Sequence, residues 1–188
     1  VDDRAGCAVL LELARVLKDR PTGPPVHLAF TVQEEFTLRG ALPLAQSLHP
    51  AIAIQIDLMM AADTPDMEGH GDIALGGGPG ISLYSFHGRG TLNGVLPHPA
   101  MVDLFEQTAL CEGIPLQRSA QVGALTDLSY VQHVGHGVAS IDAGFPMRYS
   151  HSAREVCDLG DLEQLTRLIA AALDRISPDF SLDRDDHT

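Results

Sequence analysis

The stretch that decides the fold is A-I-A-I-Q-I at residues 51–56, followed at once by Asp57. It is short, apolar and rich in isoleucine, which is typical of a strand buried on both faces of a sheet. V-H-L-A-F-T-V at residues 26–32 has the same character, and V-A-S-I at residues 138–141 is a shorter run of the same kind. Together with residues 114–118, these runs predict the strands of a central sheet.

Segments with helical periodicity alternate with these runs. Apolar residues recur there every three or four positions, as they do along one face of a helix. Helices are predicted over residues 3–18, 40–47, 100–111, 127–134 and 159–176. Strands that alternate with helices favour an α/β sandwich around a central sheet. We expect one domain over residues 1–178, with an irregular, Gly-rich region over 61–97, and a polar, frayed tail over 179–188.

The composition limits the class of protein. Of 188 residues, 25 are acidic and 12 are basic, and the formal net charge is −13. Nucleic acids and anionic membrane surfaces are bound through Lys and Arg, so we predict neither as a partner. No apolar run approaches the roughly 18 residues of a membrane span. The cysteines Cys7, Cys111 and Cys157 form no C-x-x-C pair, which indicates a reducing, cytoplasmic location and not a disulfide framework.

Acidic residues gather where the predicted strands end. Glu34 and Glu35 follow the run at residues 26–32, and Asp57 follows the run at 51–56. The carboxyl ends of strands in open α/β sheets form a crevice for ligands, and Asp2, at the start of the first predicted helix, could join it. Converging carboxylates raise one another's pKa values, and a bound divalent cation relieves this repulsion. A helix cap and a solvated Glu pair fit the same spacing, so the spacing leaves both interpretations open.

The order of short motifs along the chain adds to this pattern. The motifs are V-D-D-R-A-G (1–6), T-V-Q-E-E-F-T-L-R-G-A (31–41), I-D (56–57), A-D-T-P (62–65), L-G-G-G-P-G (75–80), L-T-D (125–127) and P-M-R-Y-S-H-S-A-R-E (146–155). This series resembles the glutamyl and tetrahedral-shell (TET) aminopeptidases, metallopeptidase family 42. G-R-G-T-L-N-G (88–94) is similar to the branch of that family found beside sugar-metabolism genes. The resemblance implies a three-layer α/β/α sandwich with a mixed central sheet, of the co-catalytic metallopeptidase type.

The resemblance gives each acidic residue a role. It implies that two divalent cations share Asp2 as a bridging ligand, zinc or cobalt being the first expectation and manganese also fitting. Glu35 and His151 would complete one metal site, and Asp57 would belong to the other. Glu34 would be the general base that takes a proton from the attacking water. The implied activity is the removal of N-terminal residues from peptide substrates.

Further expectations come from the same resemblance. Relatives often hold the peptide bond after the bridging Asp in cis, which places a cis bond between Asp2 and Asp3. Asp127 would lie in the substrate pocket near the amine of the peptide, although a helix N-cap explains an Asp there as well. The Gly-rich loop at residues 76–80 lacks the Lys-Ser/Thr ending of a phosphate-binding loop, so we do not expect it to bind a nucleotide.

The chain starts with Val1 and not with Met. Relatives carry an upstream H-x-D segment, whose His is a ligand of the metal held by Asp57, and an inserted β domain before the D-D-R motif. We therefore expect a piece of a longer protein that binds metal weakly and turns over slowly, or not at all, by itself. Homo-oligomerisation, which depends partly on the inserted domain in relatives, is expected of the full-length form.

Three alternatives stay open on the sequence alone. A glycoside hydrolase, for example an endoglucanase, also uses two acidic residues, roughly 5–9.5 Å apart and without metal. The second alternative is a non-catalytic binding or assembly module whose metal site has decayed. The third is a deacylase or carboxypeptidase of the related co-catalytic clan, which shares the fold and the metals and differs in its substrate.

Overall fold

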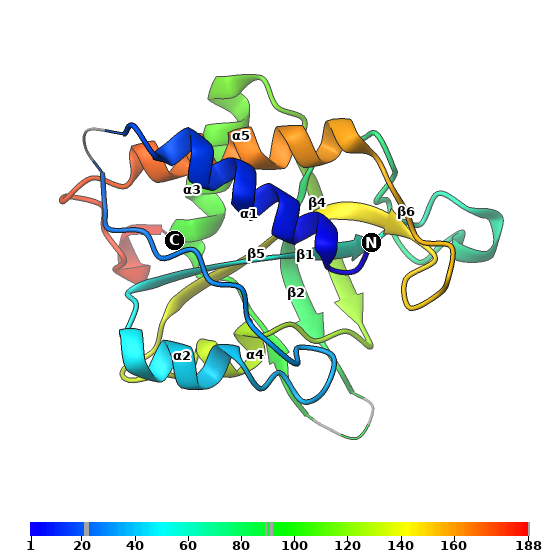
Figure 1. The fold of residues 1–188 in the computed structure, drawn as a ribbon, viewed down its shortest axis with the longest axis horizontal. Helices are drawn as coiled ribbons and strands as arrows, with labels where there is room; N and C mark the ends of the chain where they lie inside the picture. Colours follow the sequence, from blue (N-terminus) through cyan, green and yellow to red (C-terminus); the bar gives the residue numbers. More distant parts are fainter. Residues whose placement is uncertain (21–22, 89, 91, 188) are drawn as a thin grey trace.

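The computed structural model describes residues 1–20, 23–88, 90 and 92–187. In these residues a mixed six-stranded sheet lies between two layers of helices (Figure 1). The predicted three-layer α/β/α sandwich is thus confirmed. In this part of the chain, no helix is long and apolar enough to cross a membrane.

The sheet is organised around β5. Its strands are β1 (Ile52–Met60), β2 (Gly80–Phe86), β3 (Gly94–Val95), β4 (Gln117–Val122), β5 (Ala139–Arg148) and β6 (Val156–Cys157). β1 pairs with β5 in parallel over its whole length, and β2 meets the other side of β5 antiparallel at Gly80 and Ile81. β2 also pairs with β4 in parallel and with β3 antiparallel, while β6 folds back antiparallel beside the end of β5.

Helices cover the two faces of the sheet unequally (Figure 1). On one face lie α1 (Arg4–Leu17), α3 (Pro99–Glu112) and α5 (Leu159–Arg175), and on the other lie α2 (Ala41–Leu48) and α4 (Leu128–Val131). The main core fills the first side, where Ile141 and Phe145 of β5 are fully buried. Side chains alternate across a strand, so Asp142 points to the other side, and Asp57 of β1 points there too because Ile56 faces the main core.

The strand expected over residues 26–32 is wrong. The structure describes this segment as extended chain outside the sheet, and Phe30 and Val32 are 52% and 66% exposed. A β-branched, apolar run becomes a strand only where a neighbouring strand accepts its backbone hydrogen bonds. In the described part of the chain, β1 pairs with β5 and with no strand from residues 26–32.

Other elements differ from expectation where tertiary pairing sets their bounds. β1 continues past Asp57 and β5 continues past Ile141, because the two strands pair residue by residue. The region expected to be irregular contains β2 and β3, and the strand expected over residues 114–118 lies later, as β4. The helix expected over residues 127–134 is the short α4. The other four helices are confirmed.

The last residues pack more closely than a frayed tail would. Phe180 and Leu182 lie partly buried against the main core. Beyond them, the short 3-10 helix η2 (Arg184–His187) ends the described chain. Two apolar residues of this mostly polar segment therefore pack against the core.

The glycine-rich loop before β2 holds a carboxylate of the chain itself. The backbone N–H groups of Gly76 and Gly78 donate to the two carboxylate oxygens of Asp161 at 2.9 and 2.8 Å. A Cβ on Gly78 would lie 2.4 Å from the carbonyl oxygen of Pro115, so glycine permits the close approach. The loop thereby joins the sheet to the first turn of α5.

Candidate metal centre

Three of the predicted ligands meet although they lie far apart in the sequence. The Nε2 atom of His151 lies 3.3 Å from a carboxylate oxygen of Glu35 and 3.5 Å from one of Asp2. One ligand atom from each residue lies within 4.8 Å of the others, and the residues that the structure describes hold no second group of this kind. Two carboxylates and an imidazole at this spacing form a donor set suited to zinc, cobalt or manganese.

Asp2 is placed by the start of α1. Asp3 caps this helix, because its Oδ1 atom accepts a hydrogen bond from the N–H of Gly6 at 2.8 Å. The peptide bond between Asp2 and Asp3 is cis, as the resemblance implies. The pKa of Asp2 is raised, first by burial and then by the charge of Glu35.

Glu34 and Glu35 lie in a tight turn before α2. Gln33 has a left-handed φ of 59°, and the N–H of Leu38 donates to the carbonyl oxygen of Glu34 at 3.0 Å. A Cβ on Gly40 would lie 2.5 Å from a backbone nitrogen across the turn, so the turn closes only around glycine. This turn, and not the end of a strand, therefore places the two carboxylates.

His151 lies in the loop that joins β5 to β6. The ladder pair of Arg148 and Val156 closes the base of this loop. Tyr149 and His151 have left-handed φ angles of 62° and 58°, a conformation that residues with a side chain seldom adopt. The side chain of His151 is 70% exposed, so the imidazole is accessible from solvent.

Glu155 ends this loop and contacts the backbone of two ligands. Its Oε1 atom accepts a hydrogen bond from the N–H of His151 at 3.1 Å, and its Oε2 atom accepts one from the N–H of Asp2 at 3.0 Å. Glu155 therefore links the backbone of Asp2 to the backbone of His151.

Glu34 lies among other acidic groups beside the three ligands. Its pKa is raised to about 7, first by burial and then by the charges of Asp127 and Glu35. A carboxyl with a pKa near 7 can accept and release a proton at neutral pH, which a general base must do.

Asp57 lies inside β1 and outside the group formed by Asp2, Glu35 and His151. Its pKa is raised well above the usual range, first by burial and then by the charges of Asp3 and Glu34. Asp57 is therefore close enough to the same acidic groups to share their repulsion. Its Oδ1 atom accepts a hydrogen bond from the N–H of Leu58 at 2.7 Å.

Asp127 does not cap α4 with its side chain. Its Oδ2 atom accepts a hydrogen bond from the hydroxyl of Thr31 at 2.9 Å, and its Oδ1 atom is buried without a hydrogen-bond partner among the described residues. Burial raises the pKa of Asp127. Since its charge also raises the pKa of Glu34, Asp127 lies near the candidate base.

Asp142 is a buried carboxyl that the sequence analysis does not single out. It accepts a hydrogen bond from the hydroxyl of Thr126 at 2.7 Å, and burial raises its pKa to about 7. An ionisable residue inside an apolar strand indicates a functional site, because burying a charge is costly. The predicted strand ends at Ile141, so the prediction places Asp142 in an exposed loop, where a carboxylate is ordinary.

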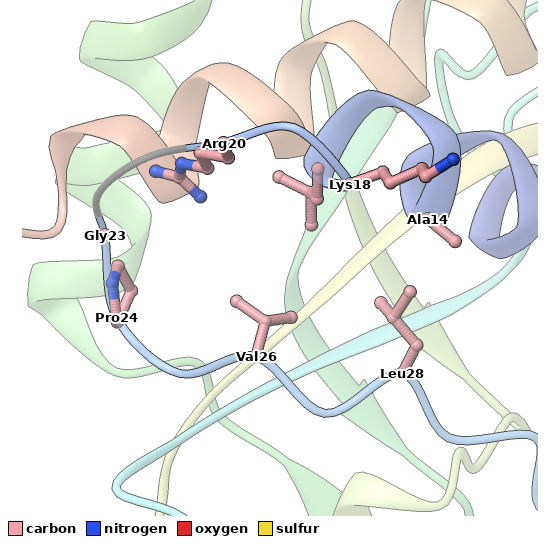
Figure 2. Close-up of a pocket in the computed structure, with 8 residues that line it drawn as sticks. Ala14, Lys18, Arg20, Gly23, Pro24, Val26 and Leu28 are labelled. Atoms are coloured by element: carbon pink, nitrogen blue, oxygen red, sulfur yellow. The ribbon is translucent and has the colours of Figure 1, made fainter.

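The pocket in Figure 2 lies away from these residues. It has a volume of about 380 Å³ and lies between the end of α1 and the extended segment that carries Val26 and Leu28. Its charged lining residues are Lys18 and Arg20, and Arg20 pairs with Asp174 at 2.6 Å. No carboxylate of the described residues lines this pocket, in contrast to the group formed by Asp2, Glu35 and His151.

Comparison with known proteins gives matches over most of the chain. A sequence model of the M42 glutamyl aminopeptidases matches residues 1–168. SgcX of Escherichia coli strain K12 is 36% identical over 188 residues, which is 100% of this chain and 50% of SgcX. Aminopeptidase APDkam598 from the archaeon Desulfurococcus kamchatkensis superposes with a TM-score of 0.87 at 32% identity. The match covers 95% of this chain and 49% of the APDkam598 chain.

The TET1 peptidase of Pyrococcus horikoshii, which can assemble into a tetrahedron or a large octahedral shell, superposes with a TM-score of 0.78 at 31% identity, over 93% of this chain and 48% of its own. The chain spans about half the length of the curated relatives it matches. The motif order, the fold and the sequence match over most of its length lead to one conclusion: the chain belongs to the M42 glutamyl aminopeptidase family.

Proposed function

We propose that the protein containing this chain is a metal-dependent aminopeptidase that hydrolyses the bond after the N-terminal residue of a peptide. The observation that carries the proposal is the meeting of Asp2, Glu35 and His151 beside Glu34, a carboxyl with a pKa of about 7. Membership of the family supports the peptide bond as the substrate. A cation site beside a base fits the hydrolysis of such a bond.

The donor set fits divalent cations. Asp2, Glu35 and His151 would hold one cation, and Asp57 would contribute to a second that shares Asp2. Burial and then the charge of Glu35 raise the pKa of Asp2, and a cation between the two carboxylates would remove their repulsion. Zinc or cobalt suits the mixed imidazole and carboxylate ligands, and manganese fits as well. When bound, such cations lower the pKa of water and stabilise negative charge on a carbonyl oxygen.

Two residues beside the cation site have the other roles in the proposed reaction, proton transfer and recognition of the substrate amine. Glu34 takes a proton from the attacking water and gives it to the amine that leaves. Asp127, buried beside Glu34 with one carboxylate oxygen unpartnered among the described residues, accepts a hydrogen bond from the free amine of the substrate. A site that recognises this amine selects the end of a peptide over its interior.

The proposal includes a cytoplasmic homo-oligomer. The cysteines Cys7, Cys111 and Cys157 are free, which fits a reducing compartment. The TET1 peptidase, at 31% identity, can assemble into closed shells. Oligomeric state is measured by light scattering on the protein at its full natural length.

Hydrolysis of leucyl- and glutamyl-anilides by the protein at its full natural length tests the proposed activity. We expect hydrolysis that a chelator removes and that zinc or cobalt restores. Glu34→Gln should keep its metal and lose about 10²- to 10⁴-fold in kcat, because the base is missing. Glu68→Gln, the same change at an exposed position, is the control and should behave as the wild type.

The same assay separates the alternatives. Glycosidase carboxylates flank a sugar without metal, whereas His151 and two carboxylates crowd together here, which favours a cation site. Hydrolysis of β-glucans that survives the chelator would favour the glycosidase. Hydrolysis of acylated amino acids or of C-terminal residues, with none of the anilides, would favour the deacylase or carboxypeptidase. Bound metal with no hydrolysis in any assay would favour the binding module.

A further inference from the structure

The loop between β5 and β6 ends in a carboxylate, that of Glu155, which accepts hydrogen bonds from the backbones of two proposed metal ligands, Asp2 and His151. Glu155 is 12% exposed, and its two oxygens contact the backbones of two different ligands, Asp2 and His151. Oε1 accepts a hydrogen bond from the N–H of His151 at 3.1 Å, and Oε2 accepts one from the N–H of Asp2 at 3.0 Å.

We propose that Glu155 is a positioning residue that fixes Asp2 relative to His151 and thereby sets the affinity of the site for its divalent cation. The inference rests on the proposed function, because it concerns the same cation site. Glu155 itself is not one of the three residues whose ligand atoms meet. It acts through the backbone of the ligands and leaves their side chains free to bind.

The conformation of the loop explains why His151 needs such support. His151 and Tyr149 both have left-handed φ angles, 58° and 62°, which cost energy in residues that carry a Cβ. Such angles persist only where surrounding contacts fix them. The hydrogen bond from the N–H of His151 to Glu155 holds one of these two residues directly and is a contact of this kind.

Asp2 needs support for a different reason. It precedes α1, so the hydrogen bonds of the helix do not hold its N–H group. The Glu155 carboxylate accepts a hydrogen bond from that N–H. In this arrangement the Asp2 carboxylate lies 3.5 Å from the imidazole of His151. Without Glu155, the backbones of Asp2 and His151 lose the side chain that links them, and we expect the cation to have to draw the ligands together as it binds.

Titration with cobalt, followed by the visible absorption of the bound ion, tests this role in the protein at its full natural length. In Glu155→Gln one carboxylate oxygen becomes an NH₂ group, so the side chain can accept from only one of the two ligand backbones. We expect the cobalt affinity to fall by about 10- to 100-fold, as on loss of other groups that orient metal ligands. The absorption bands should change in shape, because the ligand geometry changes.

Glu106→Gln is the matched control. Glu106 is a glutamate that pairs with Arg118 at 2.7 Å on the surface, and its change should leave the cobalt affinity and spectrum as in the wild type. Thermal unfolding without metal shows whether Glu155→Gln is folded. If it is not, Glu155→Asp, which keeps the charge and is too short to reach both backbones, should show the same loss of affinity.

The outcomes separate the inference from the proposed function. A wild type that binds cobalt, with a folded Glu155 variant that binds it equally and with the same spectrum, overturns the role of Glu155 alone. A wild type that binds no cobalt overturns the proposed function and this inference with it. Weaker cobalt binding in a variant that is folded without metal, with recovery of kcat at saturating cobalt, supports positioning, because the ligands and the base are then intact and only the affinity has changed.

Discussion

At the scale of single residues, the buried carboxyls predict a free energy of unfolding that depends on pH. Asp3, Glu34 and Asp142 each have a pKa raised to about 7, with burial as the first cause. An acid whose pKa is higher in the folded than in the unfolded state binds more protons when folded. Its contribution to stability is complete below the unfolded pKa near 4, and it is lost as pH rises through about 7.

The change Asp142→Asn tests this effect away from the three ligands. Asn keeps an oxygen that can accept from Thr126 and cannot ionise. Without metal, the free energy of unfolding should fall between pH 5 and pH 8 in the wild type. It should fall less in the variant, by up to about 3 kcal/mol, because roughly two pKa units of the shift of Asp142 lie above pH 5. Urea unfolding in chelator at both pH values measures the difference, and equal losses in the two proteins would contradict the account.

At the scale of elements, helices could be predicted from the sequence more securely than strands. The periodicity that marks α1 and α5 is a local property of the chain, and both helices lie where it predicts them. Strands depend on partners: β1 and β5 extend each other, whereas residues 26–32 have the composition of a strand and lie outside the sheet. The missed β2 begins in a glycine-rich region whose composition favours a loop.

Some residues of the candidate site could be predicted from the sequence and others could not. The order of the motifs, through the family resemblance, predicts Asp2, Glu34, Glu35 and His151 as members of one site. It could not predict Glu155, whose contacts with Asp2 and His151 depend on the folding of a loop against the start of the chain. Contacts between backbone and side chain leave no periodic trace in a sequence, and so the residues that orient a site are harder to predict than its ligands.

The close pairing of β1 with β5 gives a prediction at this scale. A Cβ on Gly144 would lie 2.2 Å from the carbonyl oxygen of Asp57, so Gly144→Ala must push the two strands apart. We expect a loss of about 1–3 kcal/mol in the free energy of unfolding, typical of overpacking. Gly71→Ala is the control, because the nearest atom to its added Cβ lies 3.9 Å away. A variant at Gly144 as stable as the control would contradict this prediction.

At the scale of the whole molecule, the candidate metal centre gathers three distant segments around one point. The start of α1 supplies Asp2, the turn before α2 supplies Glu35, and the β5–β6 loop supplies His151. The main core holds the start of α1, since α1 packs against α5 and the sheet, whereas α2, which follows the turn of Glu35, packs against α4 on the other face. The rigid sandwich therefore presents a site built almost entirely on its connecting segments, as is common for functional sites.

X-ray diffraction at the zinc absorption edge, from crystals of the full natural protein grown with zinc, tests the central claim most directly. The account predicts an anomalous peak within about 2.0–2.2 Å of ligand atoms from Asp2, Glu35 and His151, with a second peak near Asp57. Crystals in which these residues carry no anomalous peak, or in which zinc is bound only elsewhere, would contradict the metal centre and the function proposed for it.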